Sequence, residues 1–312
     1  MNNYTHIQTL AKLRNFVCHH SDFSNALNAI EECRDISYIN NQPVGCLLLG
    51  EGGVGKSMLC RLIRGRNKPY HCIENNVDKY IVPAFYVAVP SPITIKSIAI
   101  RMLQELGCTD IKSTSADLNY RLRILLKECK TQLIMLDEFH HLYSSSAQNK
   151  STCELVANWI KTLADETQIS ICLAGLPNIQ DNLFIDSQLA RRFSRVLKLN
   201  PLTLNIHNEA GTLKPFLKQT SNYIFENINI KFDPEITTQD LLKRIFLATS
   251  GYEAYVMELL YQSCLNALKN DRLVVSMSDF NEAYALKNIK YKPMTQKNIF
   301  QLSPNQVTEI LI

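Results

Sequence analysis

The sequence predicts an α/β fold: a parallel five-stranded sheet with helices on both faces. Two observations carry this prediction. Short apolar runs recur through the first 200 residues, and amphipathic segments with helical spacing separate them. The predicted strands lie at 46–49, 84–89, 133–136, 169–174 and 196–199. The amphipathic segments lie at about 94–106, 116–128 and 152–164. Strands that alternate with helices in this way are typical of a parallel sheet buried on both sides.

A helix is expected before the first strand. Phe23, Ala26, Leu27 and Ile30 recur at helical spacing behind the capping residues at 21–22, so the helix should run to about Arg34. The first strand is then followed within twenty residues by a glycine-rich turn and a second helix.

The organisation changes after Pro201, where strand-like runs nearly stop. The periodic segments at about 237–249, 252–269 and 278–287 predict a smaller helical domain. We therefore expect an α/β domain at 1–200, a helical lid domain at 201–290 and a C-terminal tail at 291–312. Because the tail is apolar but aperiodic, it is a possible partner-docking segment.

Composition excludes several classes of protein. The 312 residues are 46% hydrophobic and 20% charged, which excludes a disulfide-held miniprotein and wholesale disorder. The ten cysteines are scattered singly, so reduced core thiols are expected. No apolar stretch approaches eighteen residues and the first thirty residues lack a signal-peptide core, which predicts a cytoplasmic protein without a membrane span. The net charge of +4 permits an anionic partner without requiring one.

The turn after the first strand matches a phosphate-binding loop. Residues 50–57 read GEGGVGKS, which fits G-x-x-x-x-G-K-[ST] between the strand and helix that this motif requires. Glycines let the backbone N–H groups and the helix N-terminus face the phosphates, where their partial positive charge is concentrated. Lys56 is expected to reach the β- and γ-phosphates of ATP, and Ser57 to ligate Mg²⁺. The expected nucleotide-binding residues are Gly50, Glu51, Gly52, Gly53, Val54, Gly55, Lys56, Ser57 and Met58.

Two carboxylates end the strand predicted at 133–136. Ligands bind at the carboxyl edge of open α/β sheets, so Asp137 is placed to hold Mg²⁺ and Glu138 to polarise the attacking water. His140 and His141 follow at once, but no second ligand cluster and no H-E-x-x-H motif accompany them. Supporting or surface roles are therefore favoured over a metal site for the two histidines.

With these motifs in place, the sequence resembles the AAA+ ATPases and, among them, the TniB/TnsC-type transposition regulators. The resemblance covers about residues 15–200, and beyond them only a helical lid of the right size matches. The matching segments, in order, are CHHSDFSNAL, LLLGEGGVGKS, LIMLDEFHHL, NWIKTLADE, ISICLAGLPN and QLARRF. The loop and the acidic pair are shared by very many nucleoside triphosphatases, whereas AGLP followed by QLARRF is more specific to this family.

The resemblance implies an ATPase that assembles as a ring or helical filament on duplex DNA and marks the target for a transposase. A target-selection protein is a further implied partner, and the setting is the prokaryotic cytoplasm. Arginines that complete a neighbouring subunit's ATP site match Arg191 and Arg192, and the choice between them stays open. The family's sensor residue after the fourth core strand is usually polar, and in the stretch 174–178 the candidate is Asn178. The lid segment at 250–254 offers no arginine, so either slow hydrolysis or ATP acting mainly as an assembly switch is expected.

Family members contact DNA through the segment between the second and third strands and through the loop after the acidic pair. Lysines and hydroxyls there suit contacts to phosphates that are independent of base sequence. The matching residues are Lys96, Arg101, Lys112, Ser113, Thr114, Arg121 and Lys150. Thr114 with Asp117 reads equally well as a helix cap, and Arg121 as part of a solvated helix face.

Two other functions stay open. One is a different DNA-handling AAA+ enzyme, such as an IstB-like helicase loader, which would co-purify with a replicative helicase. The other is a signalling nucleoside triphosphatase that switches a protein partner without touching DNA. The sequence carries no appended sensor or effector domain, which counts against the second alternative.

Overall fold

The computed structural model describes residues 3–91, 93–109, 111, 114–144, 150–183, 187–204, 211–286 and 292–311. The chain divides into two compact units: Asp22–Leu199, and Met1–Ser21 together with Asn200–Ile312. Among the described residues, no helix combines the length and the apolar character needed to cross a membrane.

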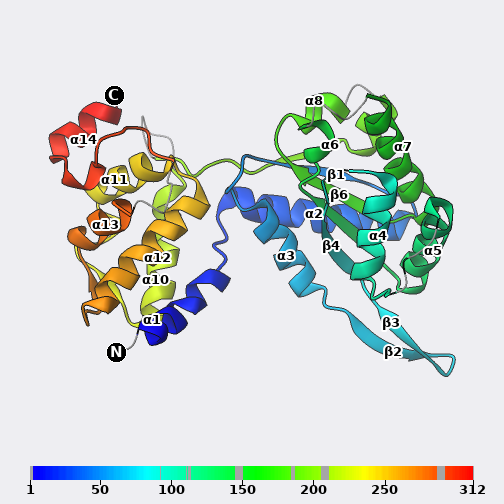
Figure 1. The fold of residues 1–312 in the computed structure, drawn as a ribbon, viewed down its shortest axis with the longest axis horizontal. Helices are drawn as coiled ribbons and strands as arrows, with labels where there is room; N and C mark the ends of the chain where they lie inside the picture. The colour runs from blue at the N-terminus through cyan, green and yellow to red at the C-terminus, as the bar shows by residue number, and fades with distance from the viewer. Residues whose placement is uncertain are drawn as a thin grey trace. The chain divides into compact units, whose positions relative to one another are not determined.

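The first unit is built on a five-stranded parallel sheet (Figure 1). Its strands are β1 (Cys46–Leu49), β4 (Ala84–Ala88), β5 (Leu133–Asp137), β6 (Ser170–Gly175) and β7 (Arg195–Lys198). They lie in the order β4-β5-β6-β1-β7. Every pairing is parallel, and Cys46 at the start of β1 is in register with Cys172 and Arg195. This confirms the predicted fold class, because each observed strand lies within one residue of a predicted apolar run.

Helices cover both faces of this sheet. Alternate strand residues such as Leu47 and Leu49 join one large apolar core with α4 (Ile95–Glu105), α5 (Ser115–Glu128), α7 (Lys150–Thr167) and α9 (Ser187–Arg192). The opposite face is covered by α2 (Ser21–Asn40) and α3 (Lys56–Arg66). The shorter helices α6 (His141–Ser144) and α8 (Ile179–Leu183) follow β5 and β6. Helix α2 continues six residues past its predicted end at Arg34, because no residue there breaks a helix.

A feature absent from the predictions is the antiparallel hairpin of β2 (Tyr70–Glu74) and β3 (Val77–Ile81). It extends away from the main sheet (Figure 1). Most of its side chains are exposed or half-buried, including the apolar Ile73 and Val77. The hairpin therefore lacks the buried face whose alternating pattern would have predicted it.

The second unit is helical. It contains α1 (Asn3–Leu10), α10 (Leu213–Ile228), α11 (Gln239–Thr249), α12 (Glu253–Lys269), α13 (Met277–Tyr284) and α14 (Pro304–Leu311). The 3₁₀ helices η1 (Ala11–Asn15) and η2 (Ile299–Gln301) and a pair of two-residue strands, β8 (Lys231–Phe232) and β9 (Val274–Val275), complete it. Three of its helices correspond to the predicted segments at 237–249, 252–269 and 278–287.

Both ends of the chain differ from the expected organisation. The first 21 residues belong to the helical unit rather than to the α/β domain, and Leu10, Leu13 and Cys18 are buried in its core. The segment expected as a tail is also part of that core, with Ile299 and Val307 fully buried. The sequence pattern missed this packing because these short apolar groups are buried by contacts with residues far away in the chain.

Candidate functional site

The glycine-rich turn joins β1 to α3 at the carboxyl edge of the sheet. A Cβ atom on Gly50 would lie 2.5 Å from the Leu199 carbonyl oxygen and 2.7 Å from a Val54 methyl carbon, so a larger residue does not fit there. Gly55 caps α3 with a φ of 97°, a left-handed conformation that favours glycine. The turn thus brings its backbone and the α3 N-terminus together as a cradle for an anion.

Lys56 folds back over this turn. Its Nζ donates hydrogen bonds to the carbonyl oxygens of Gly50, at 2.7 Å, and Glu51, at 2.9 Å. Burial lowers the pKa of Lys56, while the carboxylates of Asp137 and Glu138 act in the opposite direction. A cation is therefore held at the turn with two carboxylates close by.

Asp137, the last residue of β5, is fully buried beside the turn. Its Oδ2 accepts hydrogen bonds from Ser57 Oγ at 2.5 Å and from the Tyr86 hydroxyl at 2.9 Å. Its Oδ1 accepts the Glu138 backbone N–H at 2.8 Å. Strands β1 and β5 are separated only by β6, so their carboxyl ends bring together two oxygen groups that are eighty residues apart in the chain.

Sequence reasoning missed Tyr86. Its hydroxyl bonds Asp137, and burial together with that carboxylate raises the pKa of Tyr86 to about 12. The Arg61 guanidinium lies 5.9 Å from the centre of its ring. The signal in the sequence was a tyrosine, whose hydroxyl is polar, within the otherwise apolar run at 84–89. Only the pairing of β4 with β5 shows that this residue lies beside β5.

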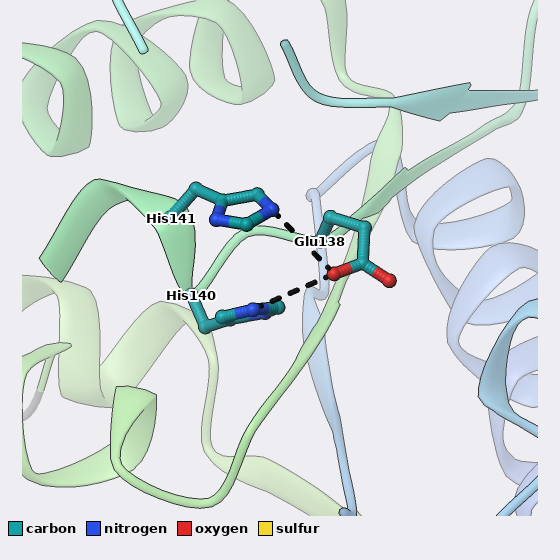
Figure 2. Close-up of side chains that lie close together, drawn as sticks. All are labelled: Glu138, His140 and His141. Carbon is teal, nitrogen blue, oxygen red and sulfur yellow. Dashed lines mark ion pairs between the residues drawn. The ribbon is translucent and has the colours of Figure 1, made fainter. Parts of the chain in front are cut away.

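Glu138 adopts a left-handed backbone conformation with φ of 59°. Its carboxylate is directed toward the rings of His140 and His141 (Figure 2). Glu138 Oε2 lies 3.5 Å from His140 Nε2 and 3.7 Å from His141 Nε2. Burial lowers the pKa of His140, which favours a neutral imidazole, although Glu138 acts in the opposite direction.

The two arginines lie at the other edge of the sheet. The Arg192 backbone carbonyl accepts the Gly45 N–H just before β1 begins, so α9 ends at the amino edge. The Arg192 guanidinium donates to the Pro43 carbonyl oxygen at 3.1 Å and pairs with Asp165 of α7. Arg191 is exposed and forms no ion pair with another described residue. Adjacent arginines thus have different surroundings, one bound within its own unit and one facing outward.

The other predicted residues lie on α4, at the start of α5 or along it, before α8, or outside the described residues. Asn178 is exposed immediately before α8. Lys96 and Arg101 are exposed on α4, and Arg121 is exposed on α5. Thr114 caps α5, because its side chain accepts the Asp117 N–H and its hydroxyl donates to the Asp117 carboxylate at 2.5 Å. Lys112, Ser113 and the side chain of Lys150 lie outside the described residues.

Solved structures share the fold. ORC2 of Aeropyrum pernix, in ADPNP–ADP complexes, is 13% identical with a TM-score of 0.59, over 84% of this chain and 68% of that chain. ORC1 of Aeropyrum pernix in complex with DNA is 16% identical with a TM-score of 0.57, over 88% and 66%. The RuvB Holliday junction branch migration motor of Thermotoga maritima is 13% identical with a TM-score of 0.51, over 86% and 70%. This chain thus spans about two thirds of each neighbour's length.

At these identities the neighbours establish the fold alone, which is the predicted AAA+ ATPase fold. The comparison with curated proteins found no match. The family model described as bacterial TniB protein matches residues 11–201, which is more than half of the chain and includes the phosphate turn, the acidic pair and both arginines. The chain therefore belongs to the TniB family of AAA+ ATPases, which is implicated in transposition.

Proposed function

We propose that this chain is a Mg²⁺-dependent ATPase that assembles on duplex DNA and recruits a transposase. The observation that carries the proposal is the meeting of the phosphate turn with Asp137, where Ser57 Oγ lies 2.5 Å from the carboxylate. Mg²⁺ prefers hard oxygen ligands and usually keeps several waters, so one hydroxyl and one carboxylate suit it. The turn would hold the ATP phosphates, and Ser57 and Asp137 would hold the metal ion.

The turn fits a nucleotide for a further reason. A Cβ at Gly50 would clash with the Leu199 carbonyl oxygen and a Val54 methyl carbon, so glycine lets the turn fold tightly against its own unit. Lys56 is kept over the turn by two carbonyl oxygens that a phosphate oxygen would replace as its partners. With ATP bound, the turn and Lys56 would hold the γ-phosphate for attack by a water molecule.

Glu138 is the proposed general base. Its side chain is 43% exposed, so water reaches it, and it directly follows the buried Asp137. Its carboxylate would orient the attacking water and accept its proton. Asn178, at the end of the adjacent strand β6, is proposed to sense the nucleotide state.

Assembly is proposed because Arg191 and Arg192 end a helix at the edge of the sheet opposite the phosphate turn. The phosphate turn follows the carboxyl end of β1, while α9 ends beside the amino end of the same strand. Four strand residues separate the two edges by about 13 Å. A second copy could instead present Arg191, whose guanidinium would neutralise charge on the γ-phosphate.

DNA binding and recruitment are supported by family membership. Exposed Lys96, Arg101 and Arg121 on α4 and α5 are proposed phosphate contacts, as are Lys112 and Lys150. Thr114 is a weaker candidate than the sequence implied, because its hydroxyl already caps α5. The other proposed partners are the transposase and a target-selection protein.

Electron microscopy and sedimentation with duplex DNA test the proposal. The protein would be compared without nucleotide, with ADP and with a slowly hydrolysed ATP analogue, at low and moderate salt. We expect rings or filaments that need the analogue and weaken with salt, because phosphate contacts release counterions. A monomer that ignores DNA in every condition would contradict the proposal and favour a signalling switch. Co-purification with a replicative helicase instead of a transposase would favour a helicase loader.

A further inference from the structure

Glu138 and the two histidines that follow it form a cluster that the proposed ATPase mechanism does not explain. Glu138, His140 and His141 each offer one ligand atom, and these atoms all lie within 4.8 Å of one another. All three residues are half-buried, so ions in solution can reach them. Figure 2 shows both rings directed at one carboxylate oxygen.

The distances do not fit direct hydrogen bonds. Glu138 Oε2 lies 3.5 Å and 3.7 Å from the two Nε2 atoms, whereas a hydrogen bond between N–H and O measures about 2.7–3.2 Å. The 3.5 Å distance matches the edge of a tetrahedron of ligands around a shared ion, and the 3.7 Å distance is slightly longer than such an edge. With metal–ligand distances of about 2.0–2.2 Å, neighbouring ligand atoms of tetrahedral zinc are separated by about 3.3–3.6 Å.

The backbone sets this arrangement. The left-handed φ of Glu138 turns its carboxylate back toward the residues that follow, and His141 begins α6. A Cβ on Gly175 would lie 3.0 Å from the His140 backbone nitrogen, so β6 fixes His140 from behind. The His141 side chain is 38% exposed, so it has room to move and to adjust the distance between its Nε2 and that of His140.

We propose that Glu138, His140 and His141 bind a divalent transition metal, with Zn²⁺ as the best-fitting ion, and that the bound metal inhibits ATP hydrolysis by occupying Glu138. Zinc accepts two imidazoles, which are borderline ligands, together with one carboxylate oxygen, whereas Mg²⁺ prefers oxygen ligands alone. Three protein ligands leave the fourth position to water. The inhibitory half of the inference rests on the proposed function, because it needs Glu138 as the base; the binding half does not.

Metal binding is measured first, on the full chain without nucleotide, with a thiol-free reductant and excess Mg²⁺ to fill oxygen sites. Co²⁺ is titrated by visible absorption and displaced with Zn²⁺. We expect one equivalent in the wild type and at least a tenfold weaker affinity in His141→Ala. His140→Ala is a second variant, and circular dichroism checks that both are folded. The matched control is His71→Ala, which removes an exposed hairpin histidine that also pairs with a carboxylate, that of Asp78 at 3.1 Å.

Each outcome decides one part. Absence of stoichiometric binding in the wild type, or unchanged affinity in both site variants, overturns the site. Loss of binding in His71→Ala also overturns it, because the metal would then lie on the hairpin.

In the ATPase assay, zinc should inhibit the wild type in step with occupancy. For the same fractional inhibition, measured against its own zinc-free rate, His141→Ala should need at least ten times more zinc. Occupancy without inhibition overturns the inhibitory role. Absence of ATPase activity refutes the proposed function while the metal titration still stands.

Discussion

Alanine substitutions at Arg191 and Arg192 test which arginine acts at the ATP site of a neighbouring copy and which one stabilises its own unit. Arg191 is exposed, so Arg191→Ala should change stability by less than about 0.5 kcal/mol. Arg192 donates to the Pro43 carbonyl and pairs with Asp165, and its side chain is 22% exposed. A charged hydrogen bond and a partly screened ion pair together contribute about 2 kcal/mol.

For a unit of this size, about 2 kcal/mol lowers the melting temperature by about 4–8 °C. Differential scanning fluorimetry should therefore detect a shift in Arg192→Ala and almost none in Arg191→Ala. ATP turnover on DNA should show the reverse order, with Arg191→Ala losing about 10³-fold or more if its guanidinium completes the neighbouring site. Arg192→Ala should keep turnover at temperatures where it remains folded.

A mixing experiment tests whether the arginine acts between copies. Arg191→Ala keeps its own base but lacks the arginine, whereas Glu138→Gln lacks the base but presents the arginine. Neither variant alone should hydrolyse ATP at the normal rate, and mixing them should restore part of the activity at mixed junctions. Normal turnover by Arg191→Ala, or absence of any recovery on mixing, would refute the reasoning.

Three other predictions follow from single residues. Glu138→Gln should still bind ATP and assemble while hydrolysis falls about 10²–10⁴-fold; normal turnover would show that another group is the base. Phe300→Ala should destabilise the helical unit by about 3 kcal/mol, because this buried ring stacks on Phe280 at 5.7 Å; an unchanged melting temperature would contradict the core assignment. Burial opposes the charged form of Asp279, but hydrogen bonds from Arg272 and Ser276 outweigh burial and lower its pKa. The pKa of Asp279 is therefore lower in the folded state than in the unfolded state. The stability that its charged form contributes is complete above the unfolded pKa, near 3.8, and is lost as the pH falls through the folded pKa. Asp279→Asn should reduce the free energy of unfolding at pH 7. In urea denaturation at a series of pH values, it should also weaken the loss of stability toward acid pH; an unchanged pH dependence would contradict this prediction.

The packing of the C-terminal segment alters the expected effect of deleting it. An exposed docking tail could be deleted without harm to ATP binding or folding. Because Ile299, Phe300 and Val307 are buried in the helical unit, deletion of 291–312 should instead lower the stability of that unit. Recruitment assays on such a deletion would then report misfolding as well as docking.

The sequence by itself determined the sheet and the phosphate turn. Runs such as 46–49 and 133–136 are apolar at every position because both faces of the sheet are covered, so they stand out without knowledge of their partners. The turn between β1 and α3 is equally local, since its glycines, Lys56 and Ser57 are fixed by a short contiguous motif.

Only the tertiary structure decided the features that depend on side-chain direction or on distant contacts. Tyr86 reaches Asp137 because β4 pairs with β5, and the sequence does not state strand order. Consecutive helix residues point about 100° apart, so Arg191 and Arg192 cannot be told apart until one is seen bound to Pro43 and Asp165. The Glu138–histidine cluster likewise depends on one left-handed backbone angle, which the residue type does not predict because non-glycine residues adopt it only when their surroundings impose it.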